Sequence, residues 1–235
     1  MTTYETVYSP SSGVINPLHK TISATKEALS HVLWLGGATD SGKSTTAQKF
    51  AERHQFDVYH FDHSSARHFE KLTVKHERAR AFIDASLDER WLDPTIPELL
   101  DFLFYLFPLR FELMLTDILA KPKDRGIVVE GFGLLPYLVQ PYLSHPNQAI
   151  WFVPTWQFKR ESMDRRNKPS FGSKTRDPQL ARTNLMERDM MLADYFRKKV
   201  ASLGYTLHET DGTLSIEQTI DKVDAHFQLY LEQRS

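Results

Sequence analysis

Residues 37–44 read Gly-Ala-Thr-Asp-Ser-Gly-Lys-Ser, which matches the pattern G-x-x-x-x-G-K-[ST]. Two glycines at this spacing let the backbone curl, so that successive N–H groups point inward at phosphate oxygens. The lysine then reaches the β- and γ-phosphates of a nucleotide, and the serine hydroxyl binds Mg²⁺. An apolar run precedes the motif and a helical pattern reaching His54 follows it. We therefore interpret the motif as a nucleotide-binding loop.

The whole motif and the residue after it form the candidate cofactor-binding loop. Its members are Gly37, Ala38, Thr39, Asp40, Ser41, Gly42, Lys43, Ser44 and Thr45. An acid in an anion-binding loop is unexpected, but such a loop holds phosphate through backbone N–H groups, so the side chain of Asp40 can point away. Two interpretations stay open: Asp40 faces the acceptor side or an arginine of a lid, or it is a solvent-facing turn residue.

Two acids close the second and third apolar runs, Asp62 and Glu130. The carboxyl ends of parallel strands meet at one edge of a sheet, where ligands bind. Asp62 could accept the proton of an acceptor hydroxyl or bind metal, or it could cap a helix. Glu130 could hold Mg²⁺ or bind the acceptor, or it could be a structural turn acid. With Lys43 and Ser44 these acids complete the predicted catalytic and metal-binding set.

A basic segment follows the fourth apolar run. Residues 155–200 hold 12 Lys and Arg against 6 Asp and Glu, a local charge of +6. The candidate catalytic or phosphate-binding arginines of this predicted lid are Arg160, Arg165, Arg166 and Arg176. Arginine suits the role because its planar fork binds phosphate bidentately, although a solvated helix face is the alternative. The turn after the fifth run could contact a nucleobase; its residues are Asp211, Gly212 and Thr213.

Five short apolar runs read as strands, at residues 31–37, 57–62, 126–131, 148–154 and 205–211. Helical patterns separate them, so the series predicts an open, parallel α/β sheet with helices on both faces. Asp177 before Pro178 predicts a helix start, and Ser215 with Gln218 predicts a capping box.

The composition and charge of the chain argue against several classes of protein. The absence of cysteine excludes a disulfide scaffold, a zinc ribbon and a thiol nucleophile. A net charge of −1 argues against general nucleic-acid binding, and residues 96–119, although apolar, carry too many charges for a membrane span. The histidines near Asp62 match no zinc spacing and are expected to lie on the surface or pack on strands. Residues 1–20 show no secretory signal, so the expected compartment is the cytoplasm.

With these motifs placed, the chain resembles the P-loop kinases of small molecules: nucleoside and nucleotide kinases, shikimate and gluconate kinases, chloramphenicol phosphotransferase and 2-phosphoglycerate kinase. The resemblance implies ATP, Mg²⁺ and a five-stranded sheet of order 2-3-1-4-5. It also implies a kinase domain over residues 31–235 after a lead-in at 1–30, with a helical acceptor-binding insertion at 63–125 and a lid at 155–177. Lys43 and Ser44 match the family's phosphate and magnesium positions, and Asp62 matches its acid after the second strand.

The expected function is transfer of the γ-phosphoryl group of ATP to a hydroxyl or phosphate of a small molecule, with nucleosides and nucleotides among the candidate acceptors. The guanine-reading motif of GTPases and the acid pair of motors are missing. A regulatory ATPase switch without an acceptor remains the alternative, and the basic lid keeps a nucleic-acid-end kinase open. The aromatic insertion fits an apolar acceptor or a packed core, and we favour the core.

Overall fold

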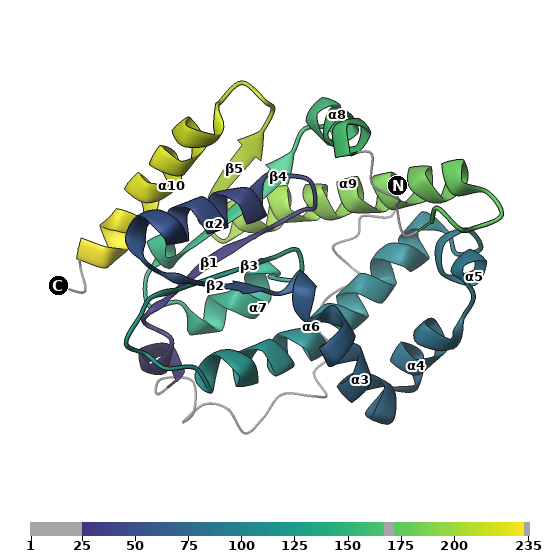
Figure 1. Ribbon diagram of the computed structural model, residues 1–235, viewed down its shortest axis with the longest axis horizontal. Helices are drawn as coiled ribbons and strands as arrows, with labels where there is room; N and C mark the ends of the chain where they lie inside the picture. The colour runs from purple at the N-terminus through teal and green to yellow at the C-terminus, as the bar shows by residue number, and fades with distance from the viewer. Residues whose placement is uncertain (1–24, 167–171, 233–235) are drawn as a thin grey trace.

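A five-stranded, all-parallel sheet forms the centre of the computed structural model (Figure 1). The structure describes residues 25–166 and 172–232; of Arg166 it describes only the backbone. The strands lie in the order β2-β3-β1-β4-β5, as predicted. Their bounds are β1 Val32–Gly37, β2 Asp57–His60, β3 Ile127–Gly131, β4 Ala149–Pro154 and β5 Thr206–Thr210. All residues of β1, β3 and β4 are buried, as expected for strands covered on both faces.

Helices cover both faces of this sheet (Figure 1). The helices named below are α2 Lys43–His54, α3 Ser65–Lys75, α4 Glu77–Asp84, α5 Leu87–Trp91, α6 Ile96–Leu119, α7 Pro136–Val139, α8 Trp156–Arg166, α9 Pro178–Ser202 and α10 Ile216–Leu231, with the short 3₁₀ helices η2 Asp62–Ser64, η3 Gln140–Tyr142 and η4 Pro146–Gln148. Leu33 and Leu35 of β1 share one core with α2 and α10. Trp34 points to the opposite face, into the core that α6 and α9 complete.

The predicted helix signals are confirmed where the structure describes them. The carboxylate of Asp177 accepts from the N–H of Leu180 at 3.0 Å, which starts α9 after Pro178. Ser215 and Gln218 form the capping box of α10. Ile216, the first residue of this helix, is 37% exposed.

The predicted insertion at 63–125 contains α3, α4, α5 and all of α6. The helices α3, α4 and α5 lie beyond one end of the sheet, whereas α6 also packs against the sheet (Figure 1). Thr95 and Glu98 form a capping box at the start of α6. Phe82 stacks on Phe102 with ring centroids 4.2 Å apart, so these aromatic side chains pack on each other as a core. Among the described residues, no helix has the length and apolarity needed to cross a membrane.

Two predicted boundaries need correction. The second strand ends at His60, not at Asp62, because the chain turns into η2; the Ser64 hydroxyl donates to the carbonyl of His60 at 3.4 Å and the Ser65 hydroxyl to that of Asp62 at 2.6 Å. The predicted lead-in lies outside the described residues as far as residue 24, but its end belongs to the fold, since Leu29 is fully buried in the core.

Candidate functional site

Residues 37–44, which we call the glycine loop, join β1 to α2. Gly37 has a φ of 122° and Gly42 a φ of 81°, conformations that other residues rarely adopt. A Cβ atom on Gly37 would lie 1.9 Å from the carbonyl oxygen of Phe152, because the Ala38 N–H donates to that oxygen at 2.8 Å. The backbone of β4 therefore holds the loop at the carboxyl edge of the sheet.

The side chain of Lys43 folds back over the glycine loop. It is only 5% exposed, and its ammonium donates to the carbonyl of Ala38 at 3.3 Å. The Ser41 hydroxyl donates to the same carbonyl at 2.8 Å. The loop thus concentrates one buried positive charge where the sequence predicts phosphate binding.

The structure brings the predicted metal-binding residues of two elements together. The Ser44 hydroxyl donates to the carboxylate of Glu130 at 2.9 Å, and the other carboxylate oxygen lies 2.7 Å from Nδ1 of His60. Glu130 is 1% exposed on β3, where it pairs in register with His60 of β2. His60 orients this carboxylate, a role that sequence reasoning missed because it assigned the histidine to the surface or to strand packing.

Asp62 lies at the start of η2, one turn beyond β2. One of its carboxylate oxygens is buried without a hydrogen-bond partner. Burial raises the pKa of Asp62 and Glu130 adds to the effect, whereas Lys43 and Arg110 oppose it. Lys43 and Glu130 therefore lie close enough to Asp62 to act on its ionisation, and we describe the three side chains as one cluster. The capping alternative loses support, because the residue before α3 is Ser64 and no side chain caps that helix.

Arg110 of α6 completes this cluster, although nothing in the sequence analysis singled it out. It is 2% exposed, donates to the carbonyl of Phe61 at 2.6 Å, and lies over the Phe61 ring at 4.1 Å. Burial lowers its pKa to about 10, while the charge of Asp62 acts in the opposite direction. Arg110 is the one basic residue of the largely apolar helix α6, and this was the available signal, because a charge is costly to bury without a partner.

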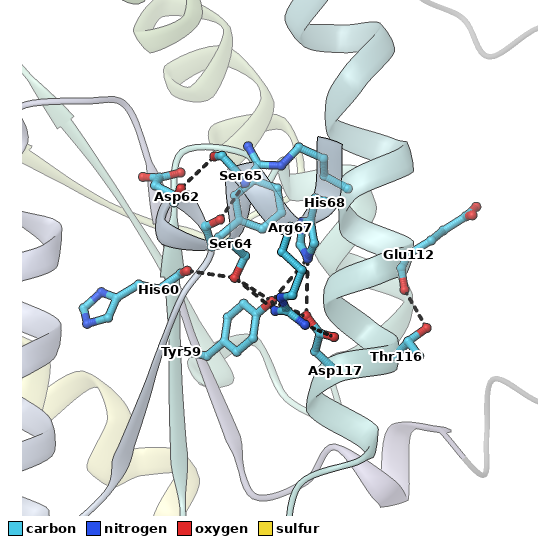
Figure 2. A network of polar contacts seen from close by, with 12 residues as sticks. Tyr59, His60, Asp62, Ser64, Ser65, Arg67, His68, Glu112, Thr116 and Asp117 are labelled. Atoms are coloured by element: carbon cyan, nitrogen blue, oxygen red, sulfur yellow. Dashed lines mark hydrogen bonds and ion pairs between the residues drawn. The ribbon is translucent and has the colours of Figure 1, made fainter. Parts of the chain in front are cut away.

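A polar network holds the segment after Asp62 against α6 (Figure 2). The carboxylate of Asp117 accepts from the Tyr59 hydroxyl at 2.6 Å and from two nitrogens of Arg67 at 2.8 and 2.6 Å. It also lies 3.3 Å from Nε2 of His68, which is fully buried. Figure 2 shows these side chains converging on Asp117, while Asp62 lies at the start of the same helical segment. The network therefore fixes the position of Asp62 relative to the sheet.

The contacts within this network also shift the pKa values of its members Asp117 and Tyr59. Burial opposes ionisation of Asp117, but its contacts with Arg67, Tyr59 and His68 prevail and lower its pKa to about 2. Burial and the hydrogen bond to Asp117 raise the pKa of Tyr59 to about 12. Asp117 is thus a charged acceptor at neutral pH and Tyr59 a neutral donor.

Asp40 faces a lysine rather than solvent. It has a φ of 58°, and its carboxylate lies 2.8 Å from the ammonium of Lys159 on α8. Its side chain is 11% exposed and that of Lys159 only 1%. The solvent-facing interpretation of Asp40 is therefore wrong. Sequence reasoning had also passed over Lys159, which lies one residue before the candidate Arg160.

The predicted lid arginines are spread over two regions. Arg160 and Arg165 are exposed on α8, where Arg165 lies 3.9 Å from Glu161, and the side chain of Arg166 is outside the described part of the chain. Arg176 is 62% exposed and pairs with Asp88 at 3.2 Å and Asp93 at 2.7 Å, next to α5. Their contact with phosphate remains a prediction.

The turn after β5 lies beside the glycine loop. The Thr210 hydroxyl donates to the carbonyl of Ser41 at 2.8 Å. The Asp211 carboxylate accepts from the N–H and hydroxyl of Thr213 at 2.9 and 2.7 Å, and Gly212 between them has a φ of 86°. A pocket of about 300 Å³ is lined by this turn together with parts of β5 and α10. Its volume lies at the lower end of the range for small-molecule sites.

The oxygen donors of the site fit Mg²⁺. Ser44, Glu130 and Asp62 supply a hydroxyl and carboxylates, which are the hard ligands that this ion prefers. Within residues 25–166 and 172–232 there is no cluster of three or more His, Cys, Asp or Glu side chains suited to a metal ion. Mg²⁺ bound with a nucleotide does not need such a cluster, because it takes one or two protein ligands plus phosphate oxygens and water. The rings of His60 and His63 are tilted by 36° to each other, with centroids 4.6 Å apart.

The sequence matches no protein-family model and no curated protein. Among solved structures, an uncharacterized protein from Eubacterium ventriosum is 13% identical with a TM-score of 0.44, over 84% of this chain and 98% of that one. The YorR protein from Bacillus subtilis, in complex with phosphorylated GDP, is 10% identical with a TM-score of 0.40, over 87% and 98%. At these values neither likeness says what this chain binds or does.

Proposed function

We propose that the chain is an ATP-dependent phosphotransferase that moves the γ-phosphoryl group to a hydroxyl or phosphate of a small molecule. One observation carries the proposal. The buried Lys43, the pair of Ser44 with Glu130, and the half-buried Asp62 lie at the carboxyl edge of the three strands β2, β3 and β1. Open parallel sheets bind their ligands at this edge.

The glycine loop and Lys43 would hold the triphosphate, with the nucleobase in the pocket beside residues 211–213. The Lys43 ammonium would contact oxygens of the β- and γ-phosphates and stabilise their negative charge. Ser44 and Glu130 would hold the magnesium ion, which neutralises charge on the phosphates and orients them. His60 would keep the Glu130 carboxylate in position.

Asp62 would act as the base for a hydroxyl acceptor. Its oxygen without a hydrogen-bond partner is available to accept the acceptor's proton. The acceptor oxygen then bonds to the γ-phosphorus while the bond to the β–γ bridging oxygen breaks, which leaves ADP and a phosphorylated acceptor. The raised pKa of Asp62 strengthens it as a base, because efficiency increases as the pKa approaches the working pH. A phosphate acceptor would need orientation rather than deprotonation.

The lid remains part of the proposal. Arg160, Arg165, Arg166 and Arg176 are its candidate cations, since closure over the phosphates would exclude water and stabilise charge in the transition state. The acceptor would enter between Asp62 and the helical insertion.

Titration calorimetry with ATP and Mg²⁺ tests the donor site. Lys43→Ala should remove measurable binding, whereas Lys49→Ala should not, because Lys49 is 44% exposed on the same helix, 4.0 Å from Glu217. Equal affinity of both variants and wild type would contradict the nucleotide site.

Release of ADP in the presence of nucleosides, nucleotides and hydroxyl compounds tests the reaction. A phosphotransferase shows acceptor-dependent release, whereas a regulatory ATPase shows the same release with every compound. Asp62→Asn should depress transfer at least about a hundredfold and leave ATP affinity within about threefold, as expected for a lost general base. Equal loss of both would remove Asp62 from the role of base.

A further inference from the structure

A cavity separate from the glycine loop lies between α3 and α6. Its volume is about 500 Å³, within the range of small-molecule sites. It is lined by the end of α3 and the residue after it, and by Leu109, Glu112 and Leu113 of α6. We call it the α3–α6 groove. Figure 2 shows Glu112 pointing away from Asp62 and from the network around Asp117, so the groove lies on a different side of α6 from the proposed acceptor site.

The floor of the groove is apolar. Leu109 and Leu113 pack against a small core that contains Leu72, which is 5% exposed. Val74, which also lines the groove, is 71% exposed, the largest value among the large hydrophobic side chains that the structure describes. Covering this surface favours binding of an apolar group, because the gain is proportional to the apolar area removed from water.

The groove carries more positive than negative charge. Residues 71–80 hold four Lys and Arg and one Glu. The two arginines of that segment are engaged, one with Asp101 and the other with backbone carbonyls of α3. Lys71 and Lys75 lie one turn apart and line the groove, and within residues 25–166 and 172–232 neither forms an ion pair. Glu112 is the one acid among the described lining residues.

We propose that the α3–α6 groove binds a free small molecule with an apolar body and one anionic group. The body lies against Leu72, Leu109 and Leu113, and the anion lies beside Lys71 and Lys75. Lysine suits this arrangement, because its stem covers apolar surface while its ammonium stays at the water boundary. A neutral molecule leaves both ammonium groups without a counter-charge, and an inorganic anion leaves the apolar floor in water. Binding at this site does not depend on the nucleotide proposed for the glycine loop.

The two helices of the groove also carry the network that fixes Asp62. On α3 Arg67 lies one turn before Lys71, and on α6 Asp117 lies one turn after Leu113. A molecule that contacts both helices stabilises their packing, because it binds the packed arrangement and not the separated one. Occupancy of the groove therefore strengthens the support of Asp62, which makes the molecule an effector rather than the acceptor. Only this consequence rests on the proposed role of Asp62.

Fluorescence titration of the full chain with anilinonaphthalene sulfonate tests the site, because this probe has an apolar aromatic body and one anionic group. The probe should bind saturably with an increase in emission. Octanoate should displace it, whereas octanol, which has the same chain length without the charge, should need at least about fivefold higher concentration. ATP should not displace the probe.

A pair of matched variants assigns the apolar part of the probe. Val74→Glu places a negative charge in the groove and should weaken probe binding at least about fivefold. Leu229→Glu makes the same kind of change at a 52% exposed leucine of α10 and should leave the affinity within about twofold of wild type.

A second pair assigns the anionic group. Lys71→Gln combined with Lys75→Gln should weaken both the probe and octanoate by about fivefold, as expected for two ion pairs at a partly exposed site. Lys123→Gln combined with Lys198→Gln removes two exposed lysines elsewhere and should leave both affinities within about twofold of wild type.

Several results would overturn the inference: no saturable probe binding, unchanged affinity in Val74→Glu or in the Lys71 and Lys75 double variant, displacement by ATP, or equal displacement by octanol. Hydrogen–deuterium exchange of wild type decides the matter if a variant does not fold. Octanoate should slow exchange in α3 and α6, and protection confined to other elements would contradict the site. Sedimentation with phosphatidylserine vesicles that octanoate does not reduce would assign the lysines to a membrane surface instead. Wild type that binds no ATP would refute the proposed function and leave this site standing.

Discussion

Asp117→Asn should destabilise the fold by an amount that depends on pH. The carboxylate accepts hydrogen bonds from Tyr59 and Arg67, and these contacts with His68 lower its pKa from 3.8 to about 2. Asparagine has the shape of the protonated acid and cannot carry the charge. Each pKa unit corresponds to about 1.4 kcal/mol, so the charged form contributes about 2 kcal/mol at pH 7.

Because the folded protein lowers the pKa of Asp117, the stabilising contribution of its carboxylate decreases as the pH falls. As the pH falls, the unfolded chain takes up the proton near pH 3.8, before the folded protein does so near pH 2. The contribution of Asp117 is complete well above pH 3.8 and is lost as the pH falls through about 2. The difference between wild type and Asp117→Asn should thus shrink from about 2 kcal/mol at pH 7 to about 1 kcal/mol at pH 3.

Urea unfolding followed by circular dichroism measures this difference at both pH values. Glu112→Gln is the matched control, because it makes the same change from carboxylate to amide at an exposed position of α6 and should cost less than about 0.5 kcal/mol. A loss below 0.5 kcal/mol at pH 7, or an equal loss at pH 3 and pH 7, would refute the reasoning that a charged Asp117 holds this network together.

Three further outcomes are expected. Gly37→Ala should cost about 3 kcal/mol or more of unfolding free energy, because its Cβ would meet the Phe152 backbone at 1.9 Å in a strained conformation; a soluble variant with an unchanged melting temperature would contradict this. Glu130→Gln should raise the Mg²⁺ concentration needed for ATP-dependent turnover by about tenfold or more, and an unchanged Mg²⁺ dependence would exclude the carboxylate from metal binding. The rate of transfer to a hydroxyl acceptor should rise with pH through a pKa above the ordinary 3.8 of Asp62, because burial raises it and only the ionised base accepts a proton; a profile that is flat below pH 6 would contradict that role.

The elements that position the site were readable from sequence because their signals are local. The runs at 31–37 and 126–131 are nearly continuously apolar, and the structure buries every residue of the strands β1 and β3 that they form. Gly37 and Gly42 were placed correctly in the loop, since their backbone conformations exclude most other residues. Glu130 was found by its place at the end of a strand, where the structure brings it to Ser44.

The partners of the site were not readable, because they come from distant parts of the chain. Lys159 and Asp189 lie more than one hundred residues from the loop, and neither belongs to a motif. Asp40 could not be assigned to a lysine when the basic segment offered several arginines nearby. Arg110 is hidden in an apolar helix, where its spacing looks like that of any core-facing residue. Such contacts depend on how helices cross, which sequence periodicity does not specify.

The place of β1 in the centre of the sheet has a consequence for the order in which the chain folds. Val32 pairs with Ile127 and Gly37 pairs with Phe152. The residues that pair with β1 therefore lie 95 and 115 positions further along the chain. Pairings this distant form slowly, because a long loop must close before they contribute. During synthesis the glycine loop therefore emerges before β3 and β4, and it acquires its shape only after β4 has been made. Until then an apolar strand stays exposed, and the nascent chain depends on protection from aggregation for that interval.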